Sequence, residues 1–245
     1  LGRTLLPIAQ MFETYGIRPV ARNNIQNVTF YVMSSNDDLG KEAGQFWTTM
    51  EEFPTPQNTD FFLHADHTSS NKPDTSAETS TSYKVDPADP ILTIGGNNLP
   101  PDIGGSIHCG PEDQSPVDSR DDVLVFNTQP FEEHFYMTGS MSATLFVSSD
   151  AIDTDFMVKV SDLYPTGEAI LIQDNAFRMR WREGGQEPVY MSGDSAAVYE
   201  VTGSLWNTSY VLAPGHSVRV AVTSSNYPRF SANPNNGKLL KDLDQ

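Results

Sequence analysis

Two aspartates separated by one threonine are the first residues of this chain whose types and spacing suggest chemistry. Asp153-Thr154-Asp155 follows a Ser-Ser-Asp stretch at 148–150. If a strand has already begun here, Asp153 and Asp155 project to the same side of it. The pair could bind calcium together with several further oxygen ligands, act as an acid/base pair, or contact another domain. Because the preceding residues favour turns, we expect a strand-entry turn and no metal site.

Five histidines are the next candidates for chemistry. His64 and His67 are three positions apart, which fits one face of a helix but not of a strand. Of the other three, His108 adjoins a cysteine, His134 follows two glutamates, and His216 lies in a Pro-Gly-His turn. None has a serine in a recognisable nucleophile turn, so we expect solvated or structural histidines and no cofactor.

Three arginines alternate with apolar residues in FRMRWRE, residues 177–183. As a strand, this stretch would place Phe177, Met179 and Trp181 on one face and Arg178, Arg180 and Arg182 on the other. Three arginines on one face could grip an anion or the carboxylates of another domain. In an acidic chain we expect them to pair with its own acids, with the interdomain contact as the alternative.

A single cysteine and two glycosylation sequons bear on the compartment in which the protein works. Cys109 has no partner for an internal disulfide, and we expect its thiol to be buried. Asn27 and Asn207 each begin an Asn-x-Ser/Thr tripeptide, which favours a secreted, extracellular glycoprotein. We expect glycan at Asn207, which precedes a turn, rather than at Asn27, which enters an apolar strand.

The charge balance excludes two classes of partner. The chain has 15 Lys+Arg and 32 Asp+Glu, a net charge of −17, and such a surface repels nucleic acid and anionic lipid. No stretch approaches the roughly 18 apolar residues of a membrane-spanning helix. Starting at Leu1 without a signal-peptide pattern, the sequence resembles a processed product or a fragment.

The elements that must position these residues are mostly strands. One helix is predicted over 3–15, with Gly16 as its stop. The apolar run 27–33 predicts a strand buried on both faces, and 60–64 predicts a shorter strand. The Ser/Thr-rich stretch 68–82 has little to bury and predicts a mobile loop.

After residue 84, short alternating runs recur between turn residues. Strands are predicted at 141–147, 156–162, 196–201 and 217–222, each with every second residue apolar. Many period-2 segments without a long helix predict a mainly β fold, an antiparallel two-sheet sandwich.

Several longer stretches carry a family resemblance. DPADPILTIGG (86–96), SSDAIDTDF (148–156) and the stretches 110–131 and 201–230 occur together and in order. They resemble the C-terminal jelly-roll domain of the cocaine esterase/X-Pro dipeptidyl-peptidase hydrolase family. NVTFYVMSSND (27–37) is similar to the last strand region of that family's α/β-hydrolase domain. The resemblance implies a hydrolase tail at 1–53 and a galactose-binding-like β jelly-roll at 54–245.

The same resemblance bears on activity. Full-length relatives are serine hydrolases of esters or amides, with the nucleophile in a Gly-x-Ser-x-Gly turn. Here the glycines with that spacing, Gly40 and Gly44, flank Glu42, so that turn is missing. In relatives the catalytic triad lies upstream of the helix matching 3–15. The implied function is therefore a non-catalytic accessory domain that braces a hydrolase core and lines its substrate pocket.

The alternative function belongs to another class, an extracellular structural or adhesive module. Relatives continue past the equivalent of 224–238 with an apolar strand, whereas this sequence ends in LLKDLDQ. Without that strand, the neighbouring strand would have unpaired backbone groups along its edge, and such an edge favours pairing with an added strand. The expected partners are thus a hydrolase portion or other copies of the chain, the latter giving a homo-oligomer or filament.

The missing nucleophile turn generates the first prediction. The purified chain should hydrolyse p-nitrophenyl esters and X-Pro anilides no faster than buffer, because covalent catalysis requires a nucleophile and its base. Turnover that persists through purification and disappears when a residue of this chain is mutated would contradict it.

Overall fold

A computed structural model describes residues 25–38, 44–52, 58–73, 80–98 and 107–238. Antiparallel strands dominate these residues, as the sequence predicted, and helices are confined to single short turns. No helix in the described ranges is long and apolar enough to cross a bilayer. The helix predicted over 3–15 lies outside the described residues.

The larger layer of the sandwich is a four-stranded antiparallel sheet with the order β5-β10-β7-β8. Its strands are β5 (Leu124–Asn127), β10 (Ser217–Thr223), β7 (Asp155–Leu163) and β8 (Ala169–Arg178). β7 and β10 coincide with two of the predicted alternating runs.

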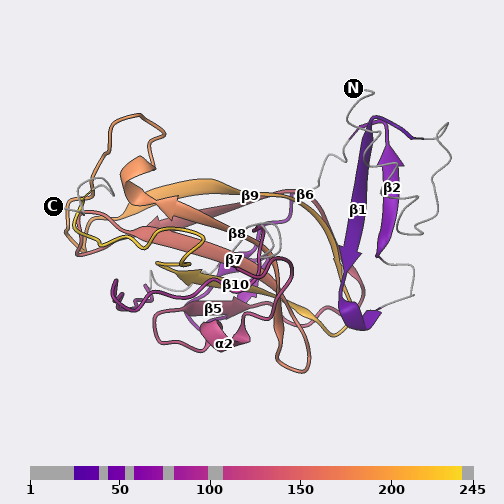
Figure 1. Ribbon diagram of the computed structural model, residues 1–245. Coiled ribbons are helices and arrows are strands. Elements are labelled where there is room, and N and C mark those ends of the chain that lie inside the picture. The colour runs from indigo at the N-terminus through magenta and orange to yellow at the C-terminus, as the bar shows by residue number, and fades with distance from the viewer. Residues whose placement is uncertain (1–24, 39–43, 53–57, 74–79, 99–106, 239–245) are drawn as a thin grey trace.

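The opposing layer is a long ribbon of β6 (Phe135–Val147) and β9 (Tyr199–Leu212). A hairpin of β1 (Val28–Ser34) and β2 (Phe46–Met50) extends this layer, with the order β2-β1-β9-β6. Only the end of β1 joins β9, through a two-residue parallel ladder. The rest of the hairpin therefore stands away from the sandwich, at the N-terminal side (Figure 1).

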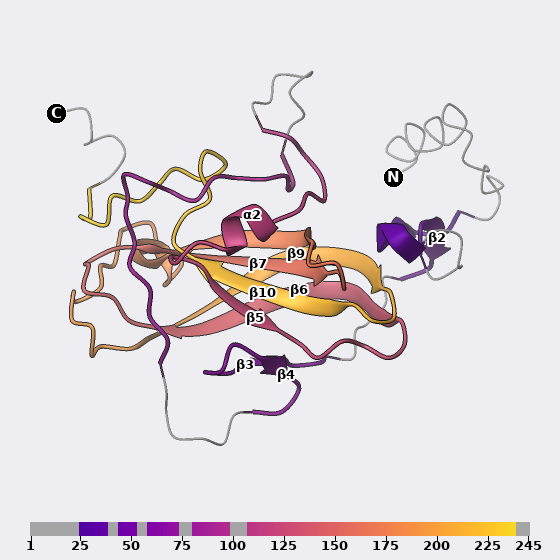
Figure 2. The ribbon, with the colours of Figure 1, turned by 90° about the horizontal axis from the view of Figure 1, so that it is seen from below.

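Short elements cover the edges and the outer face of the larger sheet. β3 (Phe62–Leu63) and β4 (Ser69–Ser70) form a small hairpin, so residues 69–70 are strand within a stretch predicted as loop. The one-turn helix α2 (Ser115–Asp118) lies over the outer face of the sheet (Figure 2). Two 3-10 turns are η2 (Asn36–Asp38) after β1 and η4 (Met179–Trp181) after β8.

The main core lies between the two layers, where the alternating residues meet. From β7 it receives Phe156, Val158 and Val160, the face predicted from their spacing. It also includes Phe126, Phe177, Met179, Val201, Leu205, Tyr210, Leu212, Val218 and Val222. Burial of these side chains is the main driving force for closing the sandwich.

Two predictions about β1 and the arginine stretch are wrong. β1 is buried on neither face along most of its length, because its main partner is β2 in a hairpin that projects from the sandwich. The stretch 177–183 is not a continuous strand. β8 ends at Arg178, and the chain then bends into η4 because the backbone N–H of Met179 bonds to the carbonyl of Thr154.

Gly203 generates a prediction about core packing. It lies on β9 opposite Phe177 of the other layer, and a Cβ at this position would lie 2.0 Å from Cε1 of that ring. Gly203→Ala should therefore destabilise the fold by about 1–3 kcal/mol through overpacking. Urea unfolding measures the change.

Gly185→Ala is the control, because its added Cβ would meet nothing closer than 3.7 Å. This substitution should change stability by less than about 0.5 kcal/mol. Equal effects of the two substitutions would contradict the packing explanation.

Candidate functional site

A cavity of about 460 Å³ lies beside the loop between Gly96 and Gly110, whose two ends are hydrogen-bonded to each other. Gly96 and Gly110 exchange two backbone hydrogen bonds of 2.7 and 2.9 Å, which bring the two arms of the loop together. Gly95 has a φ of +64°, and a Cβ there would lie 2.5 Å from the carbonyl oxygen of Gly110. Only glycine fits this close approach of two backbones.

The wall of this cavity is mainly apolar. Leu92 pairs with Tyr227 in a parallel bridge, and both side chains remain exposed. The described residues of the lining are Leu92, Thr93, Ile94, Gly95, Ile107, His108, Glu112, Tyr227 and Pro228. An apolar wall with one imidazole and one carboxylate can bind a small organic group, and these described residues include no serine or cysteine nucleophile.

Cys109 lies at the edge of the same loop and is exposed, so the expectation of a buried thiol is wrong. The reason is its position just outside the Gly96–Gly110 bridge, on an arm that leaves the sandwich.

A serine, a histidine and an aspartate meet in the interior, although they are far apart in the sequence. Ser35 follows β1, Asp162 lies on β7, and His216 occupies the turn between β9 and β10; all three are buried. The sequence did not predict this cluster, because only the fold brings residues 35, 162 and 216 together.

The geometry of this cluster differs from that of a hydrolytic triad. In a triad the aspartate holds Nδ1 of the imidazole while Nε2 accepts the proton of the serine. Here Nδ1 of His216 lies 2.7 Å from Asp162, and Nε2 lies 3.0 Å from Asp37. The Ser35 hydroxyl donates to Asp162 at 2.6 Å. No ring nitrogen is left to activate the serine, so the cluster is structural.

Two tyrosines complete this interior network. Tyr210 donates its hydroxyl proton to Asp162 at 2.9 Å, and Tyr164 accepts from the backbone N–H of Asn36 at 2.8 Å. Burial raises the pKa of Tyr210, and the charge of Asp162 raises it further. Tyr210 therefore stays a hydrogen-bond donor throughout the physiological range.

Asp153 and Asp155 form a second buried cluster. Arg180 donates to Asp153 through Nε at 2.8 Å, and Arg178 donates to Asp155 through Nε at 2.8 Å. The amide of Asn233 donates to both carboxylates, at 2.7 and 2.8 Å. Asp155 opens β7, which agrees with a strand-entry role. The cluster anchors the segment after β10, since Arg178 and Arg180 also donate to backbone carbonyls at 231 and 238.

The three arginines thus have separate environments rather than one shared face. Arg180 is buried with Asp153, and Arg178 is partly exposed with Asp155. The pKa of Arg178 is raised, mainly by its hydrogen bonds to Asp155. Arg182 lies 3.3 Å from the exposed Glu183 and stacks on the ring of Tyr199.

A buried lysine on β7 was also missed by the sequence patterns. Lys159 faces away from the core and donates to the side-chain carbonyl of Gln114 at 3.0 Å, beneath α2. Burial lowers the pKa of Lys159, although the negative charges of Asp118 and Asp174 act to raise it. Burial likewise raises the pKa of Asp118, which lies 3.3 Å from Arg219.

The histidines near β3 and β4 stabilise a turn. Nε2 of His64 lies 3.0 Å from the Ser70 hydroxyl, and Nδ1 of His67 lies 3.2 Å from the Val125 carbonyl. The His67 ring also stacks on Phe126. Within the described ranges, no group of three or more His, Cys, Asp or Glu side chains is arranged to hold a metal ion.

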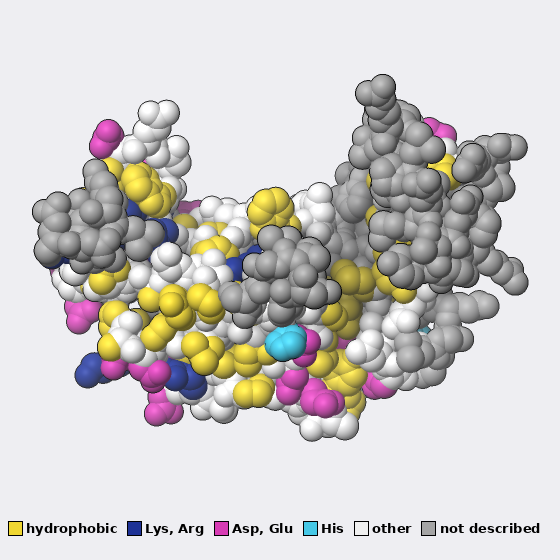
Figure 3. Space-filling model, viewed as in Figure 1, with side chains coloured by type: hydrophobic (Ala, Val, Ile, Leu, Met, Phe, Trp, Pro, Cys, Tyr) yellow, Lys and Arg dark blue, Asp and Glu magenta, His cyan; other side chains and the backbone are white. Residues whose placement is uncertain are grey.

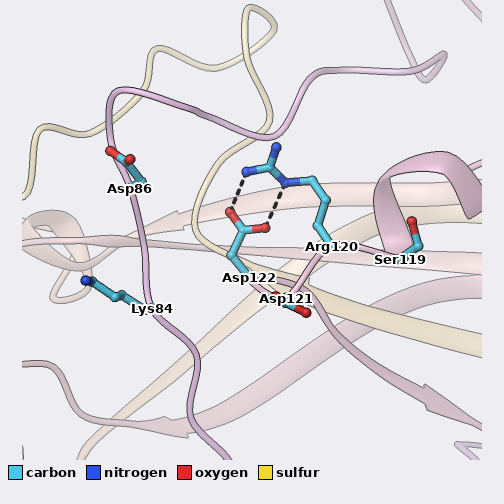
Figure 4. Close-up of a pocket in the computed structure, with 6 residues that line it drawn as sticks. All are labelled: Lys84, Asp86, Ser119, Arg120, Asp121 and Asp122. Atoms are coloured by element: carbon cyan, nitrogen blue, oxygen red, sulfur yellow. Dashed lines mark hydrogen bonds and ion pairs between the residues drawn. The ribbon is translucent and has the colours of Figure 1, made fainter.

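Another cavity, of about 410 Å³, is lined by residues of polar and charged types (Figure 4). Arg120 makes two hydrogen bonds to Asp122, of 2.8 and 3.0 Å, and lies 3.0 Å from Asp89. These carboxylates raise the pKa of Arg120. The cavity is lined by Lys84, Asp86, Ser119, Arg120, Asp121 and Asp122. It presents a surface ion-pair arrangement, and its Ser119 hydroxyl donates to the backbone carbonyl of Pro116 at 3.1 Å.

Both sequon asparagines have exposed side chains. Asn207 lies on β9 and Asn27 directly precedes β1. The Nδ2 group of Asn27 donates to Glu51 at 3.1 Å. The expectation that Asn27 is covered is therefore wrong, because the hairpin it enters projects from the sandwich.

Comparison with protein families matches residues 23–245 to the X-Pro dipeptidyl-peptidase C-terminal non-catalytic domain. The chain is also similar to cocaine esterase from Rhodococcus sp. (strain MB1 Bresler), with 40% identity over 166 residues. That similarity covers 66% of this chain and 27% of the esterase, so the chain spans about a quarter of that relative's length.

Two solved structures share the fold. The aminopeptidase from a marine sediment archaeon (Thaumarchaeota archaeon) matches with a TM-score of 0.75 and 25% identity, over 93% of this chain and 37% of that one. An α-amino acid ester hydrolase matches with a TM-score of 0.68 and 24% identity, over 78% of this chain and 34% of that one.

The buried cluster at Asp153 generates a stability prediction. Asp153→Ala should destabilise the fold by about 3–5 kcal/mol, because it leaves the buried Arg180 guanidinium without its carboxylate. Denaturant unfolding measures the change. Glu183→Ala, which breaks the exposed pair with Arg182, should cost less than about 0.5 kcal/mol. Similar costs for the two variants would refute a special role for the buried cluster.

Proposed function

Because the chain belongs to the X-Pro dipeptidyl-peptidase C-terminal non-catalytic domain family, we propose that it is the accessory β domain of a longer serine hydrolase. In this role it braces the hydrolase core and lines one wall of the substrate pocket. The observation that carries the proposal is the family match over residues 23–245. Two surfaces of the structure suit the two parts of this role.

The surface suited to bracing is the outer face of the β6–β9 ribbon. Large apolar side chains point outward there: Tyr136 is 64% exposed, Phe146 is 72% exposed and Trp206 is 62% exposed. The β1–β2 hairpin projects beside one end of the ribbon and the loop after η4 beside the other, and the molecule is hollowed between them (Figure 3). Exposed apolar residues around a hollow are typical of a surface that another domain covers.

The surface suited to pocket lining is the cavity at Leu92 and Tyr227. Its wall is apolar and partly open, and His108 and Glu112 supply the polar groups. Pockets for small organic substrates commonly combine an apolar wall with a few polar groups at domain interfaces. The substrate would then contact this domain without being attacked by it.

A second candidate function is an extracellular module that assembles through strand sharing. β6 is 13 residues long, and among the described strands it pairs only with β9. Its inward side chains Met137, Met141 and Leu145 are only partly buried. Such an edge favours addition of a strand from another copy of the chain. Light scattering distinguishes the candidates, since strand sharing requires assembly of the chain alone.

The pocket-lining role predicts a kinetic effect in the full gene product. Leu92→Ala should change kcat/KM for p-nitrophenyl esters about tenfold, the size expected for truncating an apolar wall contact. Phe62→Ala is the control, because Phe62 is similarly apolar and partly exposed but lies on the small β3–β4 hairpin. Steady-state kinetics with a set of esters of increasing acyl length measure both.

Equal kcat/KM for wild type and Leu92→Ala across the ester set would overturn pocket lining. A gene product that carries no Gly-x-Ser-x-Gly turn and hydrolyses none of the esters would overturn the hydrolase role as a whole.

A further inference from the structure

The projecting hairpin is fastened to the sandwich by polar contacts that gather at its inner end. The parallel ladder of β1 with β9 covers only Met33 and Ser34. The next four residues add further polar contacts: the N–H of Ser35 donates to Val211 at 3.2 Å, and the N–H of Asn36 donates to Tyr164 at 2.8 Å. Asp37 and Asp38 then each reach a histidine of the sandwich.

The first of these histidines lies between two carboxylates from different parts of the fold. Nδ1 of His216 is 2.7 Å from Oδ1 of Asp162 on β7, and Nε2 is 3.0 Å from Oδ2 of Asp37 on η2. Carboxylates accept hydrogen bonds and donate none when ionised. Both contacts can be hydrogen bonds at the same time only if both ring nitrogens carry a proton. A histidine ring in this state is the cationic imidazolium.

The charge balance around Asp162 favours the same form. Asp162 is fully buried and accepts from the Ser35 hydroxyl at 2.6 Å and the Tyr210 hydroxyl at 2.9 Å. A carboxylate that accepts several hydrogen bonds is stabilised in its ionised form, and a buried ion needs a counter-ion. No lysine or arginine of the described ranges forms an ion pair with Asp162, so His216 is the group placed to supply its counter-ion.

We propose that His216 is a protonation-dependent clamp between the sandwich and the β1–β2 hairpin. In the cationic form it donates to Asp162 and Asp37 together and closes the clamp. When the ring loses a proton, the buried Asp162 retains the Nδ1–H, and Nε2 turns a lone pair toward Asp37. Asp37 is about half exposed and can move away into water, which releases the turn at 35–38.

The direction of the pH effect follows from this chemistry. The clamp requires the protonated ring, so its contribution to hairpin attachment is present while both ring nitrogens carry a proton and is lost when a rise in pH deprotonates the ring. Among the described residues, the Ser35 hydroxyl lies 3.5 Å from Nδ1 of the ring, the aromatic ring of Tyr164 packs against the imidazole with 4.3 Å between centroids, and the Tyr210 hydroxyl shares the carboxylate of Asp162 with it. The second bridge, from Nε2 of His134 to Asp38 at 2.6 Å, needs only one ring proton and persists in neutral histidine.

Hydrogen exchange on the wild-type chain tests the clamp. After correction for the intrinsic pH dependence of exchange, amides of 33–38 should exchange about tenfold faster at alkaline pH, where the ring is deprotonated, than at mildly acidic pH, as expected for loss of a charge-assisted hydrogen bond. Amides of β7 and β10 should keep their protection, and so should amides of 28–32, which pair with β2 inside the hairpin. Unchanged corrected rates in 33–38, or an equal loss of protection in β7 and β10, would overturn the proposal.

Two variants separate the clamp from a general effect of pH. Asp37→Asn keeps the shape of the side chain and removes its charge, so exchange in 33–38 should lose its pH dependence. His67→Gln is the matched control, because His67 is exposed and contacts a backbone carbonyl rather than a carboxylate. It should retain the wild-type pH dependence; retention of that dependence in Asp37→Asn would overturn the assignment to Asp37.

Nitrogen-15 NMR of the wild-type histidine rings reads the protonation state directly. The closed clamp requires two protonated nitrogens in His216. A ring with one bare nitrogen under conditions in which the turn at 35–38 keeps its protection would overturn the proposal, independently of the proposed accessory function.

Discussion

The compensation of buried charge along β7 is the constraint on which the rest of the structure depends. This strand is buried along nearly its whole length and still carries Asp155, Lys159 and Asp162. Burying an ionised side chain is unfavourable unless a partner and hydrogen bonds replace its water. Each of the three therefore contacts a different segment of the chain, and these contacts determine where the segments outside the two layers lie.

Each partnership has a separate consequence. Asp155, with Arg178 and Asn233, fastens the segment after β10 to the sandwich. Lys159, through Gln114, holds the loop and one-turn helix that cover the outer face of the larger sheet. Asp162, through Ser35 and His216, holds the turn that leads into the β1–β2 hairpin. The apolar core closes the two layers, whereas these ionic contacts decide where the connecting segments lie.

The same division between core and periphery suits an accessory role. The buried serine, histidine and aspartate make structural contacts with one another and with their neighbours, and the two surfaces suited to another domain, the outer face of the β6–β9 ribbon and the cavity at Leu92, expose apolar side chains. Ser35 illustrates this, because its hydroxyl donates to Asp162, and both ring nitrogens of the neighbouring His216 lie against carboxylates. In the proposed hydrolase, the chemistry would then come from another domain, and this one would supply position and a wall.

The sequence by itself determined the mainly β class, the inward face of β7 and the resemblance to a hydrolase C-terminal domain. Alternation of apolar residues and local motifs are properties of neighbouring positions, so they are readable without a structure. Only the tertiary structure decided that Asp162 continues the inward face as a buried carboxylate, that Cys109 is exposed, and that Arg178, Arg180 and Arg182 have separate partners. The buried ion pairs join residues more than 20 positions apart, such as Arg178 with Asp155 and His216 with Asp37. No local pattern encodes which distant charge will satisfy a buried one, because the fold must bring the two together first.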